Sequence, residues 1–480
     1  MRVGFYLLFG AIPLFGQICL SNLSLQEAED IAKTYNKEFL IVKQGIVQAK
    51  ERTQQAVSRW LPSLRYLAQF RGTEQDELFF NVYSPLKPFT ASHTGYMSSL
   101  QFDQPIFSAD LLNNLKASQF MEEATHFEQA STLNELILAV RKAYYAVVTQ
   151  EISLGIQREN IEYLSYALEQ EQKKLDAGSS TILEVNQSKV SVANAISQYY
   201  GTLKKLKTAR NTLILTLGID PLLESQMCLN QKEVPIDSIQ EIAFKLQEID
   251  QNFHYLSLKL PTTDDFLNHI HSIENSRSPA LFSEAEVFDY LDYAFSHRPE
   301  LQKSQLQVSI ANQNVRSKEG NYLPVLKGYA RYSYNDQNLG PTPFGSQKYL
   351  WTGGIVLTWN LFDGFLREHE IREARSLRHS YRINYDKTYQ QVEVEIRNNL
   401  YQLEEALMSY LSSKSAVLLA EQARGQSADK LSYGKIPPLE YRDSANLLLQ
   451  ARNQNNQASY DLIEAYYQLR YSMGADLHCD

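Results

Sequence analysis

Two acidic residues, Glu440 and Asp443, are spaced so that their carboxylates could act together on a cation. Glu440 and Asp443 are three residues apart in a segment with helical spacing, and residues three apart share one helix face. Paired carboxylates on one face would favour cations. The alternative interpretation is a solvated helix face, with acidic residues near the N-terminus where the helix dipole favours negative charge. Glu184 has a similar place earlier in the chain.

A second group, His269 and His271 with Asp264 and Asp265 nearby, has residue types that bind metals. Polar surface residues are the favoured interpretation, so we predict no metal site and no cofactor. The chain has no phosphate-binding glycine loop, dinucleotide fingerprint, zinc-protease helix motif or serine-nucleophile elbow. We therefore predict that it is not an enzyme.

The N-terminal segment has the features of an export signal. Arg2 precedes an apolar run from Val3 to Phe15, which is too short to span a membrane, and small residues favour cleavage after Ser21. An interfacial or buried helix, or lipidation at Cys19, are the alternatives. Cys228 and Cys479 would remain after cleavage, and an exported compartment permits a disulfide between them; two unpaired thiols are equally compatible with the sequence.

The elements that must position these groups occur twice. Leu61-Pro62-Ser63-Leu64 reappears 262 residues later as Leu323-Pro324-Val325-Leu326, and Leu175-Asp176-Ala177-Gly178 reappears 256 residues later as Leu431-Ser432-Tyr433-Gly434. A period this long indicates two copies of one unit. We predict a leader over 1–21, a first repeat over 22–221, an acidic linker over 222–287 and a second repeat over 288–480.

Each repeat contains a long segment with helical periodicity and no proline. The segments from Ser108 to Ala177 and from Phe365 to Tyr433 would each be roughly 100 Å long as single helices. Apolar residues recur three and four apart, which is typical of packed antiparallel or coiled helices. The stripe of the first copy contains Leu133, Leu136, Val140, Tyr144, Val147 and Val148, and that of the second contains Val394, Ile396, Leu400, Leu403, Leu407 and Leu411.

Four segments alternate between an apolar and a polar face, as strands do. In the clearest, Tyr349 to Asn360, one face carries Trp351, Ile355, Leu357 and Trp359. Tyr332 and Tyr334 lie on the apolar face of Val325 to Tyr334, and the first copy has strands over Ser63 to Arg71 and Tyr96 to Asp103. Aromatics near both ends of an apolar face are typical of a transmembrane β-barrel. We expect loops around Phe79 to Thr94 and Asn335 to Gln347.

Four strands cannot close a barrel, and open sheet edges are forbidden in hydrocarbon. Copies of the chain must therefore pool their strands. Three copies would give 12 strands, an even number within the range of bacterial barrels.

The chain resembles the TolC-like outer-membrane efflux protein family. The resemblance rests on Pro62 and Pro324 at the strand starts, on Leu361-Phe362-Asp363-Gly364 between strand and helix, and on the two helical turns. The turn residues are Gly178, Ser179 and Glu184 in the first copy, and Gly434, Lys435, Pro437 and Pro438 in the second.

This resemblance implies a fold that is mainly α with a small β part. It implies a homotrimer with a 12-stranded barrel in the outer membrane and an α-helical tunnel in the periplasm. The tunnel tip would dock a periplasmic adaptor protein and an inner-membrane pump, and the channel would pass small molecules or polypeptides passively. The alternative without a pore is an exported coiled-coil scaffold or adhesin; a lipid-anchored channel would require acylation of Cys19.

The resemblance also assigns roles at the tip. Glu440 and Asp443 match acidic positions that ring the narrow entrance, and Glu184 matches a position that helps to lock the closed state. The chain departs from the family at Ile436, where some members have a basic lock residue, and at Leu431, where they have a tyrosine. Lys435 could substitute, and Pro437-Pro438 would stiffen the turn.

The linker between the repeats is acidic. The stretch from Leu222 to Tyr290 has 12 acidic and four basic residues, which argues against a nucleic-acid partner. The resemblance implies that the linker packs around the middle of the tunnel; disorder is the alternative.

Overall fold

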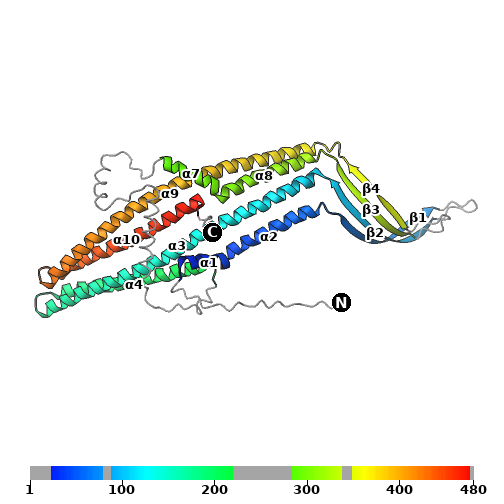
Figure 1. The fold of residues 1–480 in the computed structure, drawn as a ribbon. Helices are drawn as coiled ribbons and strands as arrows, with labels where there is room; N and C mark the ends of the chain where they lie inside the picture. Colours follow the sequence, from blue (N-terminus) through cyan, green and yellow to red (C-terminus); the bar gives the residue numbers. More distant parts are fainter. Residues whose placement is uncertain (1–22, 79–87, 220–283, 338–348, 476–480) are drawn as a thin grey trace, which may run out of the picture. The chain divides into compact units, whose positions relative to one another are not determined.

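The computed structural model describes residues 23–78, 88–219, 284–337 and 349–475 (Figure 1). The chain divides into two compact units. The first unit comprises Met1–Val42, Gln129–Pro299 and Tyr389–Asp480, and the second comprises Lys43–Glu128 and Glu300–Thr388. The predicted leader, Cys228, Cys479 and the histidine group at 264–271 lie outside the described residues.

The elements follow the same order twice, as short helices, two strands, a long helix and a shorter helix. The first series is α1 (Leu25–Tyr35), α2 (Lys37–Ser58), β1 (Ser63–Leu78), β2 (Pro88–Phe107), α3 (Ala109–Asp176) and α4 (Ile182–Leu217). The second is α7 (Glu284–His297), α8 (Pro299–Gly320), β3 (Val325–Gln337), β4 (Tyr349–Thr358), α9 (Leu366–Ser432) and α10 (Pro438–Met473). The predicted linker boundary at 287 falls inside α7.

The helices of the first unit form two hairpins, α3 with α4 and α9 with α10 (Figure 1). The long runs without proline form single helices of 68 and 67 residues, as the sequence predicts. In the described chain, no helix is both long and apolar enough to cross a membrane.

The predicted apolar stripes supply much of the buried core of this unit, with one exception. Val140 and Ile396 are fully buried, and Leu400 and Leu403 are nearly so. Val394, in contrast, is 56% exposed, so its place in the second stripe was wrong. Val394 precedes Ile396 by two positions, which is about 200° around a helix, and therefore faces the opposite side.

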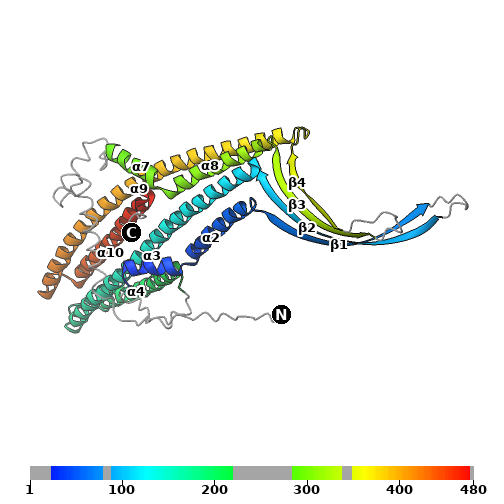
Figure 2. The same ribbon diagram turned by 45° about the vertical axis from the view of Figure 1, so that its right-hand side comes forward.

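The strands of the second unit form one antiparallel sheet in the order β1-β2-β3-β4 (Figure 2). Pro62 and Pro324 directly precede β1 and β3, where proline does not interrupt strand pairing. The strands of the first copy extend further than predicted, to Leu78 and back to Pro88, so the loop between them is shorter. The last strand ends at Thr358, which leaves Trp359 just beyond it.

Candidate functional site

The two helical hairpins turn with the same backbone geometry. Gly178 and Gly434 have φ of 71° and 68°, a left-handed conformation that glycine adopts without steric cost. The amide of Ser179 donates to the carbonyl of Lys174, and that of Lys435 to Lys430, both at 2.8 Å. These bonds satisfy carbonyls at the ends of α3 and α9, so the predicted turn residues lie where each helix reverses.

The second helix of each hairpin begins differently. In the first copy, Thr181 caps α4 and Glu184 completes a capping box, its carboxylate accepting from the Thr181 amide and the Ser180 hydroxyl, each at 2.8 Å. The Thr181 amide, and then the two hydroxyls, hold the pKa of Glu184 below its ordinary value. In the second copy Pro437 caps α10 without a side-chain bond, and Pro438 occupies the first turn.

The candidate entrance acids lie at the start of α10. Glu440 is in its first turn and is exposed, and the side chain of Asp443 is 68% exposed. Asp443, but not Glu440, lines a groove of about 720 Å³ between the starts of α4 and α10. The groove residues are Leu183, Asn186, Gln187, Val190, Ser191, Leu439, Arg442, Asp443 and Asn446.

Arg442 is a groove residue that sequence reasoning missed. Its guanidinium donates to the hydroxyl of Ser191 on α4 at 3.3 Å, and its Nε lies 4.0 Å from the Asp443 carboxylate. The positively charged Arg442 therefore lies between Glu440 and Asp443 in sequence, and its side chain is close to that of Asp443. The sequence feature that could have identified Arg442 is its position directly before Asp443.

The positions that depart from the family's lock form a small apolar core. Leu431 is 5% exposed and packs with Ala167 of α3 and Tyr441 of α10, and Ile436 packs against them. These residues pack the second hairpin against α3 through buried apolar surface. Lys435 lies over the Tyr433 ring, with Nζ 5.6 Å from the ring centroid.

The sheet carries an apolar row on one face. Register pairs Tyr66 with Leu100, Leu100 with Tyr332 and Tyr332 with Trp351, one residue from each strand. Directly paired residues share a face, so these four side chains form one row across the sheet. The Tyr332 and Trp351 rings are 5.0 Å apart, and those of Tyr334 and Tyr349 are also 5.0 Å apart.

The next row, on the opposite face, is polar. Its members are Arg65, Gln101, Arg331 and Thr352, one from each strand. The Arg331 guanidinium donates to the Gln101 side-chain carbonyl at 2.6 Å. One face of this sheet therefore suits hydrocarbon and the other suits water.

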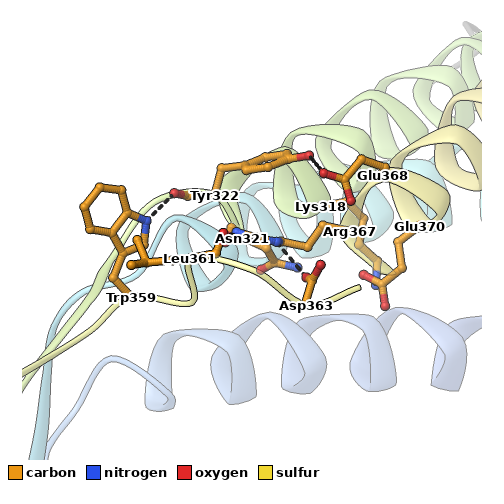
Figure 3. Close-up of polar contacts among 9 residues, drawn as sticks. All are labelled: Lys318, Asn321, Tyr322, Trp359, Leu361, Asp363, Arg367, Glu368 and Glu370. Carbon is orange, nitrogen blue, oxygen red and sulfur yellow. Dashed lines mark hydrogen bonds and ion pairs between the residues drawn. The ribbon is translucent and has the colours of Figure 1, made fainter. Parts of the chain in front are cut away.

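A buried charge pair joins the strands to the helices in the second unit (Figure 3). Arg367 of α9 donates from Nε to the Asp363 carboxylate at 2.7 Å, and their side chains are only 9% and 12% exposed. The indole of Trp359 donates to the carbonyl of Tyr322 at 3.0 Å. The Tyr322 hydroxyl in turn donates to Glu368 at 2.7 Å. The end of β4 is thus fastened to the end of α8 and the start of α9.

Within the described ranges, no cluster of three or more His, Cys, Asp or Glu side chains is placed to hold a metal ion. The histidine group, Cys228 and Cys479 fall outside the described residues.

The match to a known protein family falls in two parts that correspond to the two repeats. The family model described as outer membrane efflux protein matches residues 30–219 and 291–475. The outer membrane protein TolC of Vibrio cholerae is 21% identical over 475 residues, covering 96% of this chain and 95% of its own length. The outer membrane efflux protein BepC of Brucella suis is 20% identical over 400 residues, covering 82% of this chain and 75% of its own.

Solved structures share the fold. The Campylobacter jejuni CmeC outer membrane channel aligns with a TM-score of 0.72 at 14% identity, covering 97% of this chain and 90% of that one. The outer membrane protein VceC of Vibrio cholerae aligns with a TM-score of 0.71 at 14% identity, covering 94% and 96%. The family match spans most of the chain and locates the protein in the bacterial outer membrane, with its helical part in the periplasm. The chain belongs to the outer membrane efflux protein family.

Proposed function

We propose that the chain is a passive export channel in which three copies pool their strands into a 12-stranded barrel. The observation that carries this proposal is the sheet, with its apolar row on one face and its polar row on the other. β1 and β4 each lack a partner on one side within the described chain, and open edges are not tolerated in hydrocarbon. Pairing β4 of one copy with β1 of the next closes the sheet.

The aromatic residues support a membrane position for this sheet. Trp351 and Trp359 are eight residues apart, which is about 27 Å along an extended chain at 3.3–3.4 Å per residue. At the strand tilt of about 35–45° found in outer-membrane barrels, that length spans roughly 20 Å of membrane thickness. The apolar band of outer-membrane barrels is about 25 Å tall. Tyr332 and Tyr334 lie with Trp351 near one boundary, and Trp359 marks the other.

The helical hairpins would form the periplasmic tunnel and its entrance. Three copies of Glu440 and of Asp443 would make two rings of carboxylates, which attract cations and repel anions. Both turns are the surface offered to a periplasmic adaptor, and an inner-membrane pump would supply the energy. In this role the protein needs no cofactor, metal, catalytic residue or nucleic-acid partner.

Conductance in a planar bilayer tests the proposal. We expect discrete, cation-favouring channels from the purified protein, and loss of cation preference in Glu440→Gln/Asp443→Asn. Asp461→Asn is the matched control, because Asp461 is an exposed acid further along α10 whose partner, Gln457, is on the same helix. Conductance unchanged by the double variant would reject the entrance rings only. Folded, membrane-inserted protein without conductance would favour the scaffold alternative.

A further inference from the structure

The charged side chains that the structure describes on the four strands all lie on one face of the sheet, the polar face. They are Arg65 of β1, Asp103 of β2, and Lys327 and Arg331 of β3. Side chains alternate between the two faces of a strand, and the described positions of the apolar face carry no charge. The described polar face therefore has three positive charges and one negative charge in each copy, a net charge of +2.

Two of the positive charges lie in one row across the strands, which we call the arginine row. Arg65 pairs with Gln101, and Gln101 pairs with Arg331. Neighbouring strands are about 4.8 Å apart, so the backbones of the two arginines are separated by about 10 Å. Both arginine side chains are exposed. A small anion above Gln101 would therefore be within reach of both guanidinium groups.

The guanidinium of Arg331 is held in place by a chain of hydrogen bonds. The side-chain amide of Gln101 donates to the two carboxylate oxygens of Asp103, at 2.9 and 2.8 Å. Its carbonyl is thereby directed to Arg331, whose Nη2 donates to it at 2.6 Å. No other described residue accepts a hydrogen bond from this guanidinium. An oriented guanidinium with N–H groups to spare suits bidentate binding of a carboxylate or a phosphate.

The acid on this face does not neutralise the arginines. The carboxylate of Asp103 accepts from the Gln101 amide, and among the described residues it forms no ion pair with Arg65, Lys327 or Arg331. Like charges that are not compensated repel one another and lower the stability of a folded protein. The arginine row is therefore better explained by attraction of an anion than by stabilisation of the sheet.

We propose that the arginine row binds the carboxylate or phosphate groups of multivalent anions inside the barrel. This inference rests on the proposed function, in which the polar face lines the lumen. Each of three copies would supply both arginines, and the tilt of barrel strands would spread the row into a short spiral along the wall. A passage lined by one sign of charge concentrates ions of the other sign. The row thus attracts anions, whereas Glu440 and Asp443 of α10 attract cations.

Calorimetric titration of the purified protein in detergent with inorganic tripolyphosphate tests the arginine row. We expect binding in about 0.1 M salt, where the Debye length is about 10 Å, and loss of binding in about 1 M salt, where it is about 3 Å. Arg65→Gln and Arg331→Gln should each weaken binding about tenfold, the factor expected for one hydrogen bond to a charged group in partly solvated surroundings.

Lys327→Gln is the matched control. Lys327 is an exposed cation on the same face, four positions from Arg331 along β3, which is about 13 Å. The substitution removes one positive charge from each copy, as each arginine variant does, and should weaken binding far less. Arg65→Lys/Arg331→Lys serves if the glutamine variants do not fold. It keeps both charges and should still weaken binding, because an ammonium group cannot make the bidentate contact.

Conductance in a planar bilayer separates this inference from the proposed channel. Tripolyphosphate should reduce the current of the unsubstituted protein at low salt, and should not reduce that of Arg65→Gln/Arg331→Gln. Channels from protein that does not bind tripolyphosphate would overturn the arginine row and keep the channel.

Three other outcomes are decisive. Equal binding by the unsubstituted protein and the double variant would indicate another site and overturn the row. Arginine-dependent binding that does not reduce the current would place the anion outside the lumen, which overturns the proposal as well. Arginine-dependent binding by inserted protein that does not conduct would keep the anion site and reject the channel.

Discussion

Arg452 of α10 donates a hydrogen bond to Glu159 of α3, and so connects the second helical hairpin to the first. The same guanidinium donates to Glu421 of α9 at 2.8 Å. Both helices of the second hairpin are therefore tied to α3 through one side chain, which is 27% exposed. The pair of hydrogen bonds adds to the apolar contacts at the tip, where Leu431 and Tyr441 are buried.

Replacing this guanidinium should loosen the hairpins. We expect Arg452→Met to lower the free energy of unfolding by about 1–2 kcal/mol, since hydrogen bonds to charged groups contribute about 1.5–3 kcal/mol and the carboxylates here are partly solvated. Thermal unfolding followed by circular dichroism measures the effect. Arg397→Met is the control, because Arg397 pairs with Glu393 on the same helix and is 46% exposed. Equal effects of the two variants would contradict a special role for Arg452.

Replacing the arginine at the strand-to-helix junction should lower the free energy of unfolding more than Arg452→Met does. Arg367→Met leaves the buried Asp363 carboxylate without its partner, and breaking a buried pair costs about 3–5 kcal/mol. Denaturant unfolding should show this loss. Adding Asp363→Leu should restore much of the stability, because an apolar pair of similar volume leaves no buried charge. Arg375→Met, which removes a pair with Glu319 that is 57% and 42% exposed, should change little. Failure of the double variant to recover would contradict the charge argument.

The turn glycines should not accept a side chain without a loss of stability. Gly434→Ala forces a Cβ into the left-handed region, and we expect a loss of about 1–2 kcal/mol. Gly425→Ala is the matched control within α9, where nothing lies within 4 Å of an added Cβ, and it should stabilise the helix by about 0.5–1 kcal/mol. Unfolding midpoints that move in the same direction for both would contradict the turn geometry.

Protonation of Glu184 in acid should destabilise the first turn of α4. The folded pKa of Glu184 is lowered by the Thr181 amide and the neighbouring hydroxyls, so its contribution to stability is present above the ordinary carboxyl pKa and is lost as pH falls through the lowered folded value. Glu184 should therefore protect the amides in the first turn of α4 from hydrogen exchange at neutral pH, and this protection should be lost in acid. In Glu184→Gln this pH-dependent component should disappear. An unchanged pH profile in that variant would show that the capping box does not control the turn.

Helices and turns could be predicted from the sequence because their signals are local. The absence of proline and the apolar spacing define α3 and α9, and Gly178 and Gly434 mark their ends. The exposed side of Val394 could also have been found, because its angle from Ile396 follows from helix geometry.

The polar contacts could not be predicted, because they depend on which segments meet. Arg367 and Asp363 are four residues apart, a spacing common on exposed helices, and only the approach of Asn321 and Tyr322 buries them. Arg442 gives no sign in sequence that Ser191 of α4 lies within reach. Strand ends were missed for a related reason, since pairing with a neighbour extends β1 and β2 beyond their alternating core.

The two hairpins nearly match in length, with 68 and 67 residues in α3 and α9 and 36 in each of α4 and α10. One residue inserted into either long helix would shift everything beyond it by about 1.5 Å and rotate it by about 100°. The six-residue difference between the copies lies upstream of Arg141 and Arg397, and from there to Gly218 and Gly474 the offset is constant at 256. The net length difference between the copies thus falls in the part of each repeat that holds the strand loops and the start of the long helix, while the hairpins from Arg141 and Arg397 onward keep one spacing.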